Sequence, residues 1–377
     1  MILVFNTSLR GHYLEYFHHI YMEALQRPEK MFTFAYPEED VSQLKQLEWL
    51  TAPNITLKPV KGLNITGNIL KKARLYSKVL GCEVKTTKAD EVILTNIMQY
   101  LPFLPLYVHK TKVKGIVYSI YLYTWKTDSI KKRLSDILKY LIFKCSKVVY
   151  KVFVLADRSA ALRLNKLYKT NKFDFICDPV VRIDKNKVHD LREELGIPQN
   201  KVVVLHAGDL SHRKGTISLL EGLLSCDDTV FDRYYFLFAG RISPDVRNNF
   251  DALFDQLQTK TKGIKLITGF IPFDFLGSLI FTSDLLMLNY LQTAQSSGFI
   301  GYAADFSKPV VVISTGLLRK IVRKFKLGYI IPDASPASIR CFLENYQKEH
   351  YETSSLSSNT YLNVNCIENF VDTLIDE

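Results

Sequence analysis

The chain has 377 residues, of which 47% are hydrophobic and 23% are charged, and its mean hydropathy is close to zero. This composition is typical of a globular protein with a large core and excludes a disordered chain, and the length predicts two domains. No run approaches the roughly 18 apolar residues of a membrane-spanning helix, and no secretion signal opens the sequence. We therefore expect a cytoplasmic protein whose six scattered cysteines, without a CxxC pair, remain free thiols.

Short apolar strands alternate with amphipathic helices along the chain. In the first half we expect strands at 1–6, 31–37, 54–60, 91–97, 113–121 and 151–155, and helices at 12–26, 38–50, 65–80, 128–145 and 158–169. In the second half we expect strands at 201–206, 234–239, 264–269, 285–290 and 309–314, and helices at 216–225, 244–258, 273–282, 298–307 and 316–325. A tail from 336 to 377 is expected to form helices around a serine-rich loop at 353–358. This alternation predicts parallel sheets covered on both faces.

We therefore predict an α/β fold with two Rossmann-like domains that face each other across a cleft. The polar segment from Arg182 to Glu194, followed by Gly196-Ile197-Pro198, marks the boundary. The predicted domains are residues 1–182 and 183–350, and residues 351–377 form a helical tail that packs back on the N-terminal domain.

Ligands of open parallel sheets bind beyond the carboxyl ends of the strands, often at helix N-termini. After the first strand come Arg10, Gly11 and His12, which we predict to face the cleft. The alternative is that Gly11 only turns the chain. The first loop lacks the G-x-G-x-x-G pattern, which weighs against a dehydrogenase.

A second loop runs from Gly208 to Gly215 and places Arg213 and Lys214 beside the start of a helix. Two cations and a helix end suit a diphosphate, because both supply donors to anionic oxygens. The alternative is a solvated basic turn. Arg241, after the next strand, either reaches the same ligand or lies on the surface.

Two further loops complete the candidate site. Phe270 and Ile271 follow a strand and either border a nucleobase or pack in the core. The segment Ser296-Ser297-Gly298-Phe299 opens a helix, where a serine caps the first turn and Gly298 lets a phosphate approach the backbone amides. The alternative is a cap without a ligand.

In this order, the loops of residues 200–331 resemble the donor domain of GT-B glycosyltransferases, especially the family-4-like group. The resemblance is carried by Gly208 to Gly215, Phe238-Ala239-Gly240, Ile267 to Ile271, Ser283-Asp284-Leu285, Ser297-Gly298, Lys308 to Val312, Gly316 and Gly328. It implies a nucleotide-sugar donor held by the second domain and an acceptor held by the first. Lys214 matches the phosphate-binding lysine of the family.

The sequence also departs from the family pattern. Asp209 stands where the family has an arginine, so Arg213 or Arg241 would substitute. The places of the family's E-x7-E pair fall at about Ala294 and Tyr302. In the family the first glutamate touches the transferred sugar and the second holds the ribose of the donor, so these contacts must differ here.

The expected activity is transfer of a glycosyl unit, such as a hexosyl group, from a nucleoside-diphosphate sugar to an acceptor hydroxyl, with retention at the anomeric carbon. The expected acceptor is a carbohydrate, a lipid-linked molecule or a protein, in the assembly of surface polysaccharide or a glycoconjugate. Lys214, Arg213 and the amides near Gly298 would stabilise the leaving diphosphate, so neither a metal nor a further cofactor is expected. His12 is the candidate catalytic base. The predicted donor-binding residues are Gly208, Arg213, Lys214, Arg241, Phe270, Ile271, Ser296, Ser297, Gly298, Phe299 and Tyr302.

Three other functions compete with this one. A nucleotide-sugar epimerase on the same fold would need several cleft carboxylates, which these loops lack. A non-catalytic scaffold is favoured by the missing glutamates. A nucleic-acid-binding protein is suggested by the net charge of +11, but the chain carries no recognised nucleic-acid motif.

Most of the positive charge lies in one segment. Between Ser129 and Asp174, twelve lysines and arginines against three aspartates leave a net charge of +9. Within it, apolar residues from Ile130 to Ile142 recur at helical spacing among five basic residues. A basic amphipathic helix predicts contact with an anionic membrane surface, with the protein peripheral at the inner face of the cell membrane. The alternative is an ordinary helix with a solvated basic face.

Overall fold

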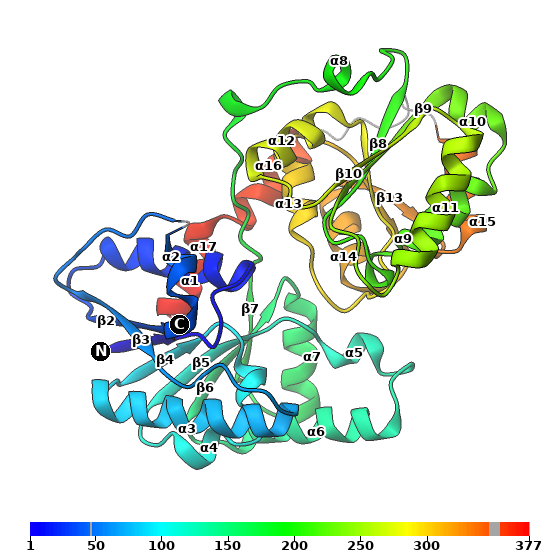
Figure 1. The fold of residues 1–377 in the computed structure, drawn as a ribbon. Helices are drawn as coiled ribbons and strands as arrows, with labels where there is room; N and C mark the ends of the chain where they lie inside the picture. The colour runs from blue at the N-terminus through cyan, green and yellow to red at the C-terminus, as the bar shows by residue number, and fades with distance from the viewer. Residues whose placement is uncertain (46, 347–354, 377) are drawn as a thin grey trace. The chain divides into compact units, whose positions relative to one another are not determined.

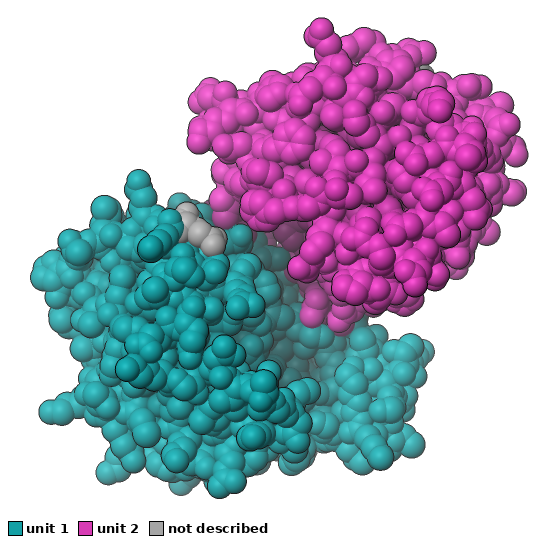
Figure 2. All heavy atoms as spheres, in the orientation of Figure 1, with its two compact units in different colours: residues 1–178, 367–377 teal, residues 179–366 magenta. Residues whose placement is uncertain are grey.

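The computed structural model describes residues 1–45, 47–346 and 355–376 (Figure 1). The chain forms two compact units, one of residues 1–178 with 367–377 and one of residues 179–366 (Figure 2). Each unit contains a parallel sheet with helices on both faces. The α/β prediction of two Rossmann-like domains is thereby confirmed. The predicted limits at 182/183 and 350/351 stay predictions, whereas the two units meet along the chain at 178/179 and 366/367.

The first unit is built on a seven-stranded sheet with the order β3-β2-β1-β4-β5-β6-β7. All six neighbouring pairs are parallel. The strands are β1 (Ile2–Phe5), β2 (Phe32–Pro37), β3 (Ile55–Val60), β4 (Glu91–Leu94), β5 (Lys112–Val117), β6 (Val149–Leu155) and β7 (Phe173–Ile176). The helices are α1 (His12–Leu25), η1 (Glu38–Asp40), α2 (Val41–Leu44), α3 (Ile69–Thr87), η2 (Ile97–Tyr100), α4 (Leu104–Tyr107), α5 (Tyr121–Thr124), α6 (Ile130–Cys145), α7 (Arg158–Tyr168) and α17 (Ile367–Asp376).

The second unit is built on a six-stranded parallel sheet with the order β10-β9-β8-β11-β12-β13. Its strands are β8 (Val202–Ala207), β9 (Tyr234–Gly240), β10 (Ile264–Thr268), β11 (Leu285–Leu288), β12 (Val310–Ile313) and β13 (Gly328–Ile331). Its helices are η3 (Lys185–Lys187), α8 (Arg192–Leu195), η4 (His212–Lys214), α9 (Thr216–Leu224), α10 (Asp228–Arg233), α11 (Arg247–Lys260), α12 (Phe273–Thr282), α13 (Gly298–Asp305), α14 (Gly316–Phe325), α15 (Pro336–Asn345) and α16 (Ser355–Val364). In each sheet the strand order changes direction beside the first strand, between β1 and β4 and between β8 and β11. Doubly wound folds bind ligands in the loops at this switch point.

Two apolar layers cover the first sheet. Helices α3, α4, α6 and α7 pack on one face, and α1 packs on the other together with α17 (Figure 1). In α17 the buried residues are Phe370, Val371, Leu374 and Ile375. In the second unit α9, α11 and α15 pack on one face and α12 and α13 lie on the other. Burial of these apolar side chains is the main favourable term in folding both units.

Several predicted elements have different limits in the structure. The helix expected at 38–50 is only η1 and α2 and ends at Leu44, where the indole of Trp49 donates to the last carbonyl; Gln46 lies outside the described residues. The strand expected at 113–121 ends at Val117, and α3 begins four residues later than predicted because Asn68 caps it by accepting from the Lys71 amide.

The C-terminal prediction was partly wrong. Residues 355–358 of the expected serine-rich loop form the first turn of α16, whereas 353 and 354 lie outside the described residues. Strand β13 and helix α10 were not predicted. All six cysteines are free thiols. Among the described residues, no helix is both long and apolar enough to cross a membrane.

Candidate functional site

The first two strands of the second sheet, β8 and β9, end in glycines whose backbones touch. The Gly208 amide donates to the carbonyl of Ala239 at 2.8 Å. Gly240 has a φ of +136°, and a Cβ there would lie 1.8 Å from the carbonyl oxygen of Gly208. At Gly208, with a φ of +101°, a Cβ would lie 2.3 Å from the Nζ atom of Lys214. At Gly240 a side chain has no room against the backbone, and at Gly208 the positive φ disfavours any other residue, so these glycines keep space at the carboxyl edge of the sheet.

Lys214 lies in the short turn η4 and is nearly buried, with 5% of its surface exposed. Its ammonium donates to the carbonyl of Ala207 at 2.9 Å and lies over two rings, 4.5 Å from the centroid of Phe299 and 5.3 Å from that of Tyr290. No carboxylate among the described residues forms an ion pair with it. Lys214 is therefore not solvated, unlike the lysine of an exposed basic turn. A buried ammonium with three donors and one carbonyl partner is a strong site for an anion.

Arg213 and the start of α13 border the same ammonium. The Arg213 guanidinium lies 6.0 Å from the ring centroid of Tyr290. The backbone carbonyl of Arg213 accepts from the Leu291 amide at 3.0 Å. The hydroxyl of Tyr290 lies 3.3 Å from that of Ser297, which caps α13 by accepting from the Phe299 amide. Tyr290 thus links the two loops that sequence reasoning had treated separately.

Ser296 provides an independent indication of a ligand. Its hydroxyl oxygen is buried and has no hydrogen-bond partner among the described residues. The next residues, Ser297 and Gly298, begin α13, and Gly298 is exposed. A buried hydroxyl without a partner costs free energy, and a helix start carries free amide donors. Both features favour an anion at this position.

Aromatic side chains form the neighbouring wall. Tyr302 packs edge-on against Phe299 at 5.9 Å and against Phe273 at 5.5 Å between ring centroids. Phe270, from the loop after β10, is 91% exposed, while Ile271 is half-buried. An exposed phenylalanine at this edge is a surface on which a planar ring can stack.

The family glutamates have no counterparts in this wall. Ala294 is completely buried, and Tyr302 belongs to the aromatic group. Arg241 has 79% of its side chain exposed and pairs with Asp209 at 3.5 Å, so it lies on the surface, one of the two positions expected for it. Sequence reasoning missed the roles of Tyr290 and Phe273 and the orphaned hydroxyl of Ser296. Tyr290 lies two residues after the end of β11, near the carboxyl edge of the sheet, and was thus detectable in principle.

His206, on β8, is a buried side chain beneath the site. One ring nitrogen lies 3.0 Å from the carbonyl of Met287 and the other 3.0 Å from the hydroxyl of Thr216. Since a carbonyl only accepts, Nδ1 carries the proton, and Nε2 accepts from Thr216. Burial lowers the pKa of His206 from its ordinary 6.5 to about 4, opposed by the bond to Met287 and assisted by the positive charge of Lys214.

The depressed pKa of His206 predicts a pH-dependent stability. Between pH 6.5 and 4 the unfolded chain binds a proton that the folded chain does not, so the free energy of unfolding falls as the pH falls. At pH 5 this loss is about 2 kcal/mol relative to pH 7.5. The His206→Gln variant is expected to start less stable and to lose that part of the slope. Urea unfolding of both proteins at the two pH values measures the difference, and identical slopes would contradict the assignment.

In the first unit, Arg10, Gly11 and His12 lie at the carboxyl edge of the sheet, as β1 leads into α1. Gly11 is the N-cap of α1 with a φ of +57°, and Arg10 is exposed with its Nε 3.9 Å from Asp40. The His12 ring lies 4.4 Å from that of Tyr13 and 4.8 Å from that of Tyr118. They follow the first strand as expected, and their predicted positions in a cleft and their predicted roles remain predictions.

His12 belongs to a group of side chains that sequence reasoning did not assemble. Tyr16 donates to Asp178 at 2.7 Å, at the end of β7, and Tyr16 and Tyr118 stack at 6.1 Å. His12 and Glu15 keep exposed surface, and partial desolvation acts on both: it lowers the pKa of His12, with Asp178 acting in the opposite direction, and together with the charge of Asp178 it raises the pKa of Glu15. A neutral imidazole beside a carboxylate is suited to accept a proton from a hydroxyl.

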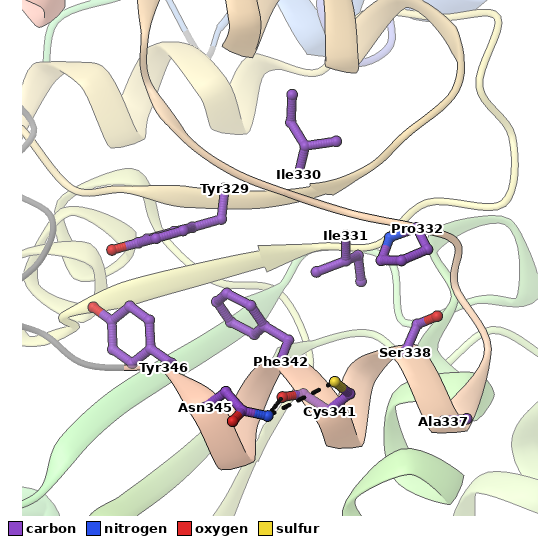
Figure 3. A pocket seen from close by; sticks show the side chains of 10 residues that line it. All are labelled: Tyr329, Ile330, Ile331, Pro332, Ala337, Ser338, Cys341, Phe342, Asn345 and Tyr346. Carbon is purple, nitrogen blue, oxygen red and sulfur yellow. Dashed lines mark hydrogen bonds between the residues drawn. The ribbon is translucent and has the colours of Figure 1, made fainter.

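A separate pocket of about 560 Å³ lies between the edge strand β13 and α15 (Figure 3). Its ten lining residues are uncharged, and rings of Tyr329, Phe342 and Tyr346 form one part of it. It does not include any of the candidate residues above. Among the described residues, no group of three or more His, Cys, Asp or Glu side chains is placed to hold a metal ion.

No protein-family model matches the chain, and no curated protein sequence matches it. Solved structures do match it over its whole length. A glycosyltransferase from Rickettsia africae has a TM-score of 0.69 at 16% identity and covers 100% of this chain and 96% of its own. WaaG, a glycosyltransferase involved in lipopolysaccharide biosynthesis, gives 0.67 at 16% identity with 100% of both chains covered. Anabaena HepE in complex with UDP and glucose gives 0.70 at 15% identity, with 100% and 98% covered. At these identities the similarity establishes the fold, which is the GT-B fold that the sequence predicted.

Proposed function

We propose that this protein transfers a glycosyl unit from a nucleoside-diphosphate sugar to an acceptor hydroxyl. Lys214 carries the proposal, because its buried ammonium has one carbonyl partner and no counter-ion among the described residues. A diphosphate supplies the missing charge. The orphaned hydroxyl of Ser296 and the amides that start α13 lie in the adjoining loop and supply further donors. Two similar structures, both of Anabaena HepE, are complexes with UDP and glucose and with UDP-glucose, which supports this ligand class.

In the proposed reaction, the bond between the anomeric carbon and the diphosphate oxygen breaks, and the electron pair leaves with the diphosphate. Lys214, Arg213 and the helix start stabilise the charge that develops on the leaving oxygens. The acceptor oxygen forms the new bond, and its proton passes to His12, whose pKa is lowered by partial desolvation. We propose retention at the anomeric carbon and a hexose as the transferred sugar.

The donor's nucleoside is proposed to lie on the aromatic wall. In place of the carboxylate that would hold a ribose, the chain presents Tyr302 beside Phe299 and Phe273. Phe270 is exposed on the same sheet edge and provides a face for the base. Arg241 and Ile271 complete the rim of this proposed donor site.

We propose that the acceptor belongs to the assembly of a surface polysaccharide or glycoconjugate, on the cytoplasmic side of the cell. The similar structure that supports this is WaaG, a glycosyltransferase involved in lipopolysaccharide biosynthesis. A carbohydrate or lipid-linked acceptor fits the polar and aromatic edge formed by His12, Tyr13 and Tyr118 better than an apolar one, because rings and hydroxyls both contact sugars.

We propose that transfer needs no metal, since cations of the protein replace one. Release of UDP or GDP from a panel of nucleotide sugars, incubated with the protein and cell-envelope acceptors, is expected to continue at an unchanged rate in EDTA. The Lys214→Met variant is expected to lose at least about 100-fold, as transition-state donors of this kind contribute about 2.7–4 kcal/mol. Activity that EDTA abolishes and Mn²⁺ restores would contradict metal independence.

The second candidate is a protein that binds the nucleotide without catalysis, and the uncharged Ala294 and Tyr302 favour it. It predicts thermal stabilisation by UDP or GDP without release of nucleotide from any sugar donor. The two candidates therefore share a binding result and differ in turnover.

A further inference from the structure

Helix α6 of the first unit carries an apolar stripe that faces solvent. We define the α6 stripe as Ile130, Leu134, Leu138 and Leu141, whose side chains are 73%, 61%, 55% and 40% exposed. At about 100° per residue these four positions span an arc of roughly 80° and extend about 16 Å along the helix. Helices of folded domains normally turn such residues toward the core.

The opposite face of α6 already holds the helix on its sheet. Asp136, Tyr140 and Phe143 are buried, and the rings of Tyr140 and Phe143 pack against Phe173 of β7. α6 therefore has two apolar faces, one packed on the sheet and one exposed. The stripe is not needed to anchor the helix.

Cations flank the α6 stripe on both sides. In the helical projection Lys131 lies at one border and Arg133 and Lys144 at the other. Lys131 and Lys144 are exposed and have no anionic partner among the described residues, while the Arg133 guanidinium lies 5.4 Å from the ring of Trp125. Trp125 is itself 38% exposed at the N-terminal end of α6.

We infer that the α6 stripe and its flanking cations dock the protein on an anionic lipid membrane. An apolar stripe with cations at both borders matches a bilayer surface, where acyl chains lie beneath anionic headgroups. An exposed tryptophan at the helix end is typical of the interfacial layer. A nucleic acid would leave the aliphatic stripe without a partner, and a second copy of the chain would bring like charges together. Docking through α6 is independent of the donor chemistry of the second unit.

Flotation of the full chain with vesicles tests the inference. Binding to vesicles containing phosphatidylglycerol is expected at low salt, with little binding to neutral phosphatidylcholine vesicles. The double variant Leu134→Ser/Leu138→Ser is expected to bind at least about tenfold more weakly, and its residual binding should vanish at high salt. Lys131→Glu/Lys144→Glu is expected to lose at least about 25-fold at low salt, since each cation strengthens binding about fivefold.

Matched controls come from the second unit. Leu356→Ser removes a leucine of α16 that is more exposed than either leucine changed in the stripe, and Arg323→Glu/Lys324→Glu reverses two exposed cations on α14; both variants should bind like the parent protein. Thermal stabilisation by UDP should be unchanged in every variant, which separates failure of the membrane site from failure of the donor site. The inference is overturned if the parent protein does not bind anionic vesicles at low salt, or if the stripe variant binds them as tightly as the parent protein. It is equally overturned if light scattering shows that the parent protein is a dimer and that the stripe variant is a monomer.

Discussion

Replacing Lys214 with methionine is expected to remove most of the thermal stabilisation that UDP or GDP gives the second unit. A ligand at about 100 times its Kd stabilises the folded state by about 2.7 kcal/mol, or several degrees for a domain of this size. Loss of a charge-assisted hydrogen bond to phosphate costs about 1.5–3 kcal/mol of binding, so the shift of the parent protein should fall by more than half. Differential scanning at matched nucleotide concentrations measures both melting temperatures.

The same variant distinguishes a ligand site from a structural lysine. A buried ammonium without a counter-ion costs folding free energy, and methionine can pack along the rings of Tyr290 and Phe299. Without nucleotide, Lys214→Met is therefore expected to melt at the same temperature as the parent protein or higher. Lys324→Met is the control, because Lys324 also lies over a ring, that of Phe325, but is exposed. A destabilised Lys214→Met with an intact nucleotide shift would show that the lysine only supports the fold.

Replacing Gly240 with alanine is expected to cost roughly 4 kcal/mol or more and to abolish nucleotide binding. The new Cβ would lie 1.8 Å from the Gly208 carbonyl oxygen, so the ends of β8 and β9 must separate. This movement would also displace the backbone that forms the proposed donor site. Urea unfolding, followed with and without UDP, measures both effects.

Gly269→Ala is the matched control for that change. Gly269 also has a positive φ, +107°, but a Cβ there meets nothing within 4 Å. Its alanine variant carries only the conformational penalty, roughly 1–2 kcal/mol. Equal losses in the two variants would mean that backbone strain, and not the contact between the strand ends, explains the glycine at 240.

The fold was predictable because the signals for it are local. Runs such as Val202 to Leu205 are continuously apolar, and the strand that they begin is followed by Gly208, which fixes both a buried strand and its end. The misses occurred where tertiary contacts decide. Residues 355–358 have turn-forming serines yet start α16, which packs on α13 and α14, and β13 is a four-residue edge strand.

The candidate site was predictable only as a set of loops. Their positions follow from strand ends, so Gly208, Lys214 and Gly298 were found from the sequence. The burial of Lys214 was not, because it depends on Phe299, which lies 85 positions away in the chain but directly over the ammonium. The group of His12, Tyr118 and Asp178 was missed for the same reason, since three strand ends far apart in sequence bring it together.

Helix α17 has a consequence for how the protein is made. It supplies Phe370, Val371 and Leu374 to the layer that α1 begins, and Arg27 of the α1 end binds both Asp372 and Asp376. A ribosome synthesises residues 179–366 before it reaches this helix. The second unit can therefore fold as soon as its last residue is synthesised, while one face of the first sheet still lacks the helix that covers it. The first unit to be started is the last to be completed, and until then its nascent form exposes an apolar surface that chaperones can bind.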